Sequence, residues 1–193
     1  MWQQISIFFL FCLMISHQKA DGINNIMTKP IDIIAQTCKK CANQSEFFSD
    51  SFCEASLQTV DVSHSTNLQG LALIAMDLAL KNATNTISSI EELLSKKTLD
   101  PFAIGCLNDC LDLYSWGVST LKDAIRAFLI EEFDTANVWI SAVMEDAGTC
   151  EDGFGEKEGE VSPLTNENYD LAQLCDIALC ITHLLPSLPS NSS

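Results

Sequence analysis

Apolar residues recur at intervals of three and four positions along four long stretches of the chain, which is the spacing of one face of an α-helix. Each stretch begins near a residue that can cap a helix, namely Thr66, Asp100, Asp134 or Thr165. No convincing strand pattern appears anywhere in the sequence. The connections between the stretches are short, so the pattern predicts an all-α protein, an antiparallel up-down-up-down four-helix bundle.

The second stretch carries the most sustained apolar stripe. Asp100 and Pro101 form a good helix start, with Asp at the N-cap and Pro at the first helical position. Trp116 falls off the stripe, so we expect it to be partly exposed. The stripe itself predicts a buried helix face and consists of Leu107, Cys110, Tyr114, Val118, Leu121, Ile125 and Phe128.

The second and third stretches are separated by a breaker-like segment, residues 131–135, that lies about midway between Cys110 and Cys150. If the two helices fold back antiparallel around this segment, both cysteines reach the same level of the bundle. A disulfide needs Cα atoms within roughly 7 Å, and this register could supply that distance. We therefore expect Asp134 or Thr135 to cap the third helix and a disulfide to link its far end to the second.

Shorter elements are predicted on either side of these helices. Residues 23–53 read as a short helical hairpin that Cys38 and Cys53 could staple, and the first long helix should run from Thr66 to about Lys97. Residues 151–163 are rich in glycine and acidic residues and lack the alternating ligands of a calcium loop, so they predict a solvated loop. Thr165 should cap the last helix and Pro186 should end it.

The N-terminus carries an apolar run over residues 5–15, which suits a secretory signal peptide and is too short to span a membrane. We interpret residues 1–20 as the signal peptide, 21–186 as one helical domain and 187–193 as a frayed tail. No later segment is apolar enough to span a bilayer. The sequence therefore predicts a secreted, extracellular protein, with N-glycosylation sequons at Asn43, Asn82 and Asn191.

Nine cysteines are present, and Cys12 lies in the predicted signal peptide. The remaining even number favours disulfides in a secreted chain, although eight cysteines allow 105 pairings. Zinc is the competing interpretation, because Cys38 and Cys41 have CxxC spacing. No second CxxC follows, so we expect no metal site and no cofactor.

A net charge of −16 makes nucleic acid and anionic membranes poor partners. A basic protein is a better partner, and an equally good interpretation is that the charge only keeps the chain soluble. Catalysis is not predicted, because the sequence has no GxSxG, no phosphate-binding glycine loop and no HExxH.

Several short motifs carry a resemblance that covers about residues 23–185. The motifs are Thr37-Cys38-Lys39-Lys40, Phe52-Cys53-Glu54-Ala55-Ser56-Leu57, Leu107-Asn108-Asp109-Cys110-Leu111-Asp112-Leu113-Tyr114 and Thr149-Cys150-Glu151-Asp152-Gly153-Phe154. Together with a signal peptide, they resemble the plant invertase and pectin methylesterase inhibitor family. The spacing from Cys38 to Cys53 and the segment 162–168 resemble its pollen-allergen-like branch, whose members carry invertase-inhibitor names.

The resemblance implies a four-helix bundle with an N-terminal hairpin, and disulfides Cys38–Cys53 and Cys110–Cys150. Cys41, Cys106, Cys175 and Cys180 lie outside the family's four-cysteine framework, so they could pair with one another or stay buried as thiols.

The resemblance further implies inhibition of a cell-wall enzyme through a protein–protein complex. Invertase inhibitors of known type carry Pro-Lys-Phe where this chain has Phe133-Asp134-Thr135. These three residues are candidate target-facing residues, and they look more like the pectin methylesterase side of the family. Pectin methylesterase is therefore the first target predicted, and invertase is the alternative.

Two functions of another kind fit the same pattern. A disulfide-linked helical protein can carry an apolar ligand, in which case it should enclose a ligand-sized internal cavity, whereas an inhibitor bundle should be packed solid. A secreted bundle without inhibitory activity is the other alternative.

The apolar run over residues 5–15 predicts signal cleavage near Ala20. Mass spectrometry of the secreted protein should find an N-terminus within a few residues of Asp21. Recovery of an intact Met1 on secreted material would overturn this prediction.

Overall fold

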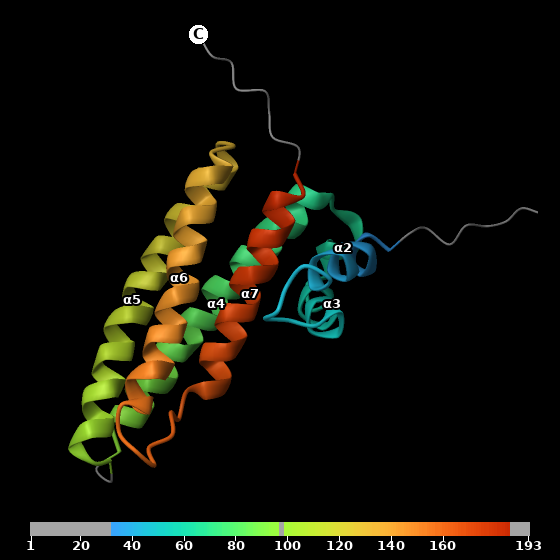
Figure 1. Ribbon diagram of the computed structural model, residues 1–193. Helices are drawn as coiled ribbons and strands as arrows, with labels where there is room; N and C mark the ends of the chain where they lie inside the picture. Colours follow the sequence, from blue (N-terminus) through green and yellow to red (C-terminus); the bar gives the residue numbers. More distant parts are fainter. Residues whose placement is uncertain (1–31, 97–98, 186–193) are drawn as a thin grey trace, which may run out of the picture. The chain divides into compact units, whose positions relative to one another are not determined.

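A computed structural model describes residues 32–96 and 99–185 of the chain (Figure 1). These residues form one compact unit, and no helix within them is long and apolar enough to cross a membrane. The predicted signal peptide, the start of the predicted hairpin and the predicted tail lie outside the described residues. The helices are α2 (Ile33–Ala42), α3 (Asp50–Gln58), a short 3-10 helix η1 (Asp61–Ser65), α4 (Leu68–Leu94), α5 (Pro101–Leu129), α6 (Phe133–Gly155) and α7 (Thr165–His183).

The four long helices form the predicted antiparallel bundle (Figure 1). Each packs against two neighbours, in the cyclic order α4, α5, α6, α7 and back to α4. The α5–α6 pair therefore lies on one side of the bundle and the α4–α7 pair on the other. This arrangement confirms the predicted fold class.

The bundle core contains the predicted stripe of α5. Leu107, Cys110, Tyr114 and Leu121 are each 2% exposed or less, so these residues do face the interior. Alanines on α4, α5, α6 and α7 fill positions between the larger side chains, which lets the helices approach closely. Trp116 is 56% exposed, as its place off the stripe predicts.

Helices α2 and α3 form the N-terminal hairpin. Asp32 and Ser49 cap their N-termini through side-chain oxygens that accept from backbone N–H groups. Cys38 and Cys53 are joined by a disulfide with Cα atoms 5.5 Å apart. The predicted staple between the two arms is confirmed.

A second disulfide, Cys41–Cys180, links this hairpin to α7 over 139 residues of sequence. Polar contacts reinforce the link: Ser45 Oγ donates to Asp176 Oδ2 at 2.5 Å, and Gln173 Nε2 donates to the Phe47 carbonyl at 3.0 Å. Of the four cysteines left open by the sequence, two therefore pair across the fold. The other two, Cys106 and Cys175, are free and buried.

The third disulfide, Cys110–Cys150, joins α5 to α6 with Cα atoms 5.0 Å apart. Between these helices the chain reverses within residues 130–132, where Glu131 adopts a left-handed φ of 65°. That conformation ends α5 abruptly, because a left-handed residue cannot continue a right-handed helix. The predicted antiparallel register is confirmed, whereas the break between the helices covers residues 130–132 rather than the predicted 131–135, because α6 already begins at Phe133.

Three predicted helix starts were wrong by one to three residues. Asn67 rather than Thr66 caps α4, with its Oδ1 accepting from the Gly70 N–H at 2.9 Å. Helix α6 begins at Phe133 and α7 at Thr165, and neither has a side-chain cap, so Asp134 and Thr165 do not cap them. The tight turn at Glu131 starts α6 at Phe133, so Asp134 and Thr135, the two predicted caps of this helix, lie inside its first turn.

The predicted acidic loop was also wrong over its first part, because α6 continues through residues 151–155. Burial explains the difference: Phe154 is 1% exposed and packs in the core, and the Cys110–Cys150 bridge holds the preceding turn against α5. Core packing here outweighs the low helix propensity of Gly153 and Gly155.

We expect the Cys110–Cys150 disulfide to contribute about 4 kcal/mol to the free energy of unfolding, because it closes a loop of 40 residues. Replacing Cys150 with Ser should clearly lower the melting temperature and leave Cys110 unpaired, so that a thiol reagent titrates one more thiol in the denatured protein.

Cys106→Ser is the matched control, because that thiol is unpaired and its loss should change the melting temperature little. A peptide map linking Cys110 to any cysteine other than Cys150 would contradict this assignment.

Candidate functional site

An open hollow of about 830 Å³ runs along the seam between α5 and α6. Glycines open it: a Cβ atom at Gly105 or Gly153 would meet nothing within 4 Å. We call this hollow the α5–α6 groove; its lining includes Phe102, Gly105, Asp109, Asp112, Leu113, Trp116, Thr149, Asp152, Gly153 and Glu156. Cys110 and Cys150 also line it, so a disulfide joins the two helices that form the groove.

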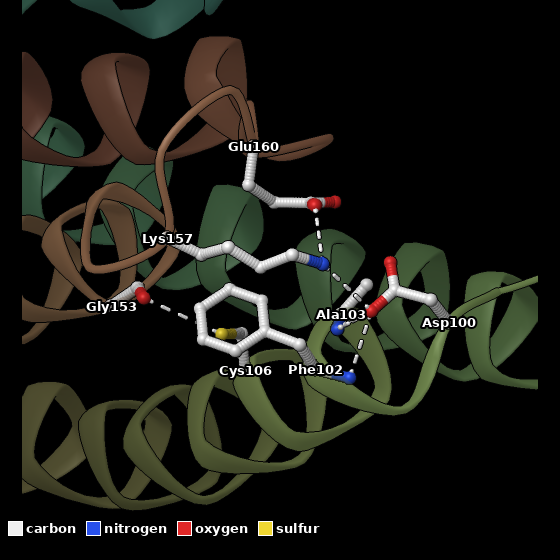
Figure 2. Close-up of polar contacts among 7 residues, drawn as sticks. All are labelled: Asp100, Phe102, Ala103, Cys106, Gly153, Lys157 and Glu160. Atoms are coloured by element: carbon white, nitrogen blue, oxygen red, sulfur yellow. Dashed lines mark hydrogen bonds and ion pairs between the residues drawn. The ribbon is translucent and has the colours of Figure 1, made fainter.

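A polar cluster lies beside the Phe102 end of the groove (Figure 2). The Lys157 ammonium is 3.1 Å from Asp100 Oδ1 and 3.2 Å from Glu160 Oε2, and it lies 5.0 Å from the centre of the Phe102 ring. The hydrogen bond from Lys157 lowers the pKa of the Asp100 carboxyl. The hydrogen bonds to Asp100 and Glu160 raise the pKa of Lys157. Asp100 also caps α5, so one carboxylate holds both the helix start and the chain beyond α6.

The rest of the groove is acidic. Asp109, Asp112, Asp152 and Glu156 line it, and no Lys, Arg or His appears among its described lining residues. Asp112 lies one helical turn before Trp116, so the two side chains share a face of α5. The groove thus combines four carboxylates with an indole ring that is open to solvent. Sequence reasoning noted the exposure of Trp116 but missed the groove, because its two walls are about 40 residues apart in sequence.

Both free thiols have a raised pKa, with burial as the main cause. Cys106 lies on α5 and its Sγ donates to the Gly153 carbonyl at 3.4 Å (Figure 2). Cys175 is fully buried on α7. A raised pKa leaves little thiolate at neutral pH, so neither thiol is an activated nucleophile.

A chain of hydrogen bonds joins three helices of the bundle. Tyr114 Oη on α5 donates to Asn168 Oδ1 on α7 at 2.8 Å, and Asn168 Nδ2 donates to Glu151 Oε2 on α6 at 2.7 Å. Burial raises the pKa of Tyr114, so its hydroxyl stays neutral and remains a donor. The network fixes the relative positions of the three helices.

The candidate target-facing residues lie in the first turn of α6, at the opposite end of that helix from Cys150. The Phe133 ring packs against Phe128 with ring centres 5.0 Å apart, whereas Asp134 is exposed and Thr135 partly so. All three line a hollow of about 470 Å³ that also contains His183. Phe133 therefore has a packing role, and Asp134 is the residue best placed for an outside contact.

The predicted glycosylation sites differ in accessibility. Asn43 is exposed at the C-terminal cap of α2, where a glycan would meet solvent. Asn82 lies inside α4, and its Oδ1 is buried without a hydrogen-bond partner. Asn191 lies outside the described residues. Asn43 is thus the stronger of the two described candidates.

Two features of the described residues bear on what the protein could bind: its possible metal ligands and its hollows. Within residues 32–96 and 99–185, no three His, Cys, Asp or Glu side chains lie together as metal ligands would. The hollows described above are open at the surface, and the core side chains of the bundle are packed against one another.

The carboxyl of Asp146 on α6 lies where burial disfavours its charged form. Asp146 Oδ2 is buried without a hydrogen-bond partner, and a Cβ at Gly117 of α5 would lie 3.8 Å from it. Burial raises the pKa of Asp146 to about 6. The pKa of the buried Cys175 thiol on α7 is raised by burial first, and then by Asp176 and Asp146.

The chain is similar to one family of plant inhibitors and to individual proteins named as inhibitors. Residues 32–181 match the family model described as plant invertase/pectin methylesterase inhibitor. A Platanus acerifolia protein named "Putative invertase inhibitor" is 43% identical over 154 residues, which cover 80% of this chain and 86% of that protein. A pectinesterase inhibitor of Actinidia deliciosa is 30% identical over 154 residues, 80% of each chain.

A solved structure shows the same fold. The crystal structure of mutant form A of a pectin methylesterase inhibitor from Arabidopsis aligns with a TM-score of 0.68 and 26% identity, over 79% of this chain and 99% of that one.

Protonation of Asp146 should make stability depend on pH. Its folded-state pKa of about 6 lies above the ordinary value, so its contribution is full below about pH 4 and is lost as pH rises through about 6. Asp146→Asn should therefore raise the free energy of unfolding at pH 7.5 by about 1 kcal/mol, after allowing for solvent screening. Denaturant unfolding at pH 4.5 and 7.5 measures the difference.

Glu145→Gln, at an exposed neighbouring position on α6, is the control and should change stability little at either pH. Equal effects of the two substitutions would show that the carboxyl of Asp146 is not the cause.

Proposed function

Because the chain belongs to the plant invertase/pectin methylesterase inhibitor family, we propose that it is a secreted inhibitor of a plant cell-wall enzyme, with pectin methylesterase as its first target. The observation that carries this proposal is the family match over residues 32–181, which spans the whole bundle and the hairpin. The two disulfides of the family framework, Cys38–Cys53 and Cys110–Cys150, are both formed.

The proposed mechanism is steric. The inhibitor lies across the substrate groove of the enzyme and excludes the polysaccharide, using outward-facing residues of the bundle helices. No chemistry on the inhibitor is required. Three disulfides hold the bundle and the hairpin in place, so little conformational freedom is lost on binding, which favours a tight complex.

The choice of pectin methylesterase rests on the first turn of α6. Pro-Lys-Phe of the known invertase inhibitors is replaced here by Phe133-Asp134-Thr135, and Phe133 is occupied in packing against Phe128. The exposed carboxylate of Asp134 has the opposite charge to the lysine that it replaces. A site that binds that lysine would disfavour this carboxylate.

Invertase is the second candidate, and one observation favours it. The 43% identity to the Platanus acerifolia protein exceeds the 30% identity to the Actinidia deliciosa pectinesterase inhibitor. Identity over the whole chain reports mostly on the fold, whereas the α6 turn concerns a contact surface, so we rank pectin methylesterase first.

The net charge of −16 supports an encounter with a basic enzyme. Secretion through the predicted signal peptide would bring the protein to the cell wall. Disulfides persist in that oxidising compartment, and the chain forms three of them.

We expect the purified protein to inhibit a basic pectin methylesterase and to leave invertase active, with association slowing as salt rises because the attraction is electrostatic. Assays with both purified enzymes, at low and at physiological salt, measure this. Potent inhibition of invertase alone would reverse the target assignment while leaving the inhibitor class intact.

Replacing Phe133-Asp134-Thr135 with Pro-Lys-Phe tests the α6 turn, provided that circular dichroism shows the fold unchanged. Because Phe133 packs against Phe128, a gentler variant keeps Phe133 and changes only Asp134→Lys. It should weaken inhibition of pectin methylesterase several-fold. The same substitution at exposed Asp77 on α4 is the matched control and should have a smaller effect.

A further inference from the structure

The α5–α6 groove has an aromatic ring toward each end, one next to a cation of the protein itself and the other open. At the first, the Lys157 ammonium lies 5.0 Å from the centre of the Phe102 ring and pairs with Asp100 and Glu160 (Figure 2). A cation between carboxylates and over an aromatic face is a favourable arrangement. The fold thus satisfies this end of the groove with its own cation.

The other end has the same chemical components without the cation. Trp116 is 56% exposed, and Asp112 lies one helical turn away on the same helix. Asp152 adds a carboxylate from the part of the α6 wall between the two ends, and the described lining includes no basic residue. An exposed indole beside unpaired carboxylates presents a negative ring face and a negative potential to the same region of solvent.

From this geometry we propose that the α5–α6 groove binds an arginine side chain presented by a surface loop of a basic partner protein, with the guanidinium over Trp116. Arginine suits the site better than lysine, because its planar group stacks on an indole and donates to carboxylates in a fixed fork. That this partner is the target enzyme rests on the proposed function.

The groove is a suitable place for such a side chain because it is both open and fixed. Gly105 and Gly153 keep the groove open on the Phe102 side of the disulfide, since a Cβ at either position would meet nothing within 4 Å. The Cys110–Cys150 disulfide at its base prevents the two walls from separating. A preformed site of this kind binds with little loss of conformational entropy.

A peptide titration tests the groove without any enzyme. The probe is Ac-Gly-Arg-Leu-Arg-Gly-NH₂, and its uncharged twin carries citrulline in place of arginine. The indole N–H resonance of Trp116, assigned by its loss in Trp116→Phe, reports binding to the full secreted protein. The arginine peptide should shift this resonance saturably and bind about tenfold more tightly than the citrulline twin at low salt.

Asp112→Asn/Asp152→Asn should weaken the arginine peptide about fivefold or more. The matched control is Asp77→Asn/Glu91→Gln, which removes the same charge from exposed positions on α4, a helix that does not line the groove. The control should change affinity less than twofold. Equal binding of the two peptides, or an equal loss in the control, would overturn the proposal.

An inhibition assay separates this proposal from the proposed function. If the protein inhibits a wall enzyme, Trp116→Ala should lose about tenfold in potency and Trp116→Phe should recover part of it. Undiminished inhibition by Trp116→Ala would reject the groove as the contact surface and leave the inhibitor standing. Binding of the arginine peptide by a protein that inhibits neither enzyme would reject the proposed function and leave the groove standing.

Discussion

The antiparallel register of α5 and α6 is the constraint on which the rest of the structure depends. Cys110 faces Cys150, Gly117 faces Val143, and each pair is centred on the reversal at Ile130. The left-handed turn at Glu131 sets this register at one end of the helix pair. The disulfide holds it nearer the other end, at Cys110, which lies 20 residues before Ile130. Once two helices are fixed in this way, the remaining helices have a single apolar surface to cover.

The surface chemistry follows from the same register. Glycines and carboxylates that are far apart in sequence come to lie along one seam, and the result is an acidic hollow with an exposed indole. Close core packing and disulfides make that surface stiff, which suits a protein that acts by contact. The strong negative charge accelerates the encounter with a basic partner, while the shape and position of individual side chains decide which partner stays bound.

The hairpin α2–α3 is held to the bundle by a different device. A hairpin of this size buries little apolar area, so its position on a larger bundle needs additional links. The Cys41–Cys180 disulfide supplies one, and hydrogen bonds from Gln173 and Tyr169 to the Phe47 carbonyl supply others. These links join the first and last described helices of the chain, so both ends of the fold are fixed together.

The sequence by itself determined the helical class, the four-helix bundle and the buried stripe of α5. These features follow from periodicity and local spacing, which act over one element or one hairpin. The Cys38–Cys53 and Cys110–Cys150 bridges were implied by the resemblance to the family, and the expected antiparallel register gave independent support for the second. Tertiary structure alone decided the Cys41–Cys180 pair, the free state of Cys106 and Cys175, and the continuation of α6 to Gly155. Each depends on a contact between distant segments. A disulfide between cysteines 139 residues apart has no local sequence signature. The burial of Phe154 in the core outweighs the low helix propensity of Gly153 and Gly155 beside it. The α5–α6 groove belongs to the same group, because its walls come from two helices and exist only once the register between them is set.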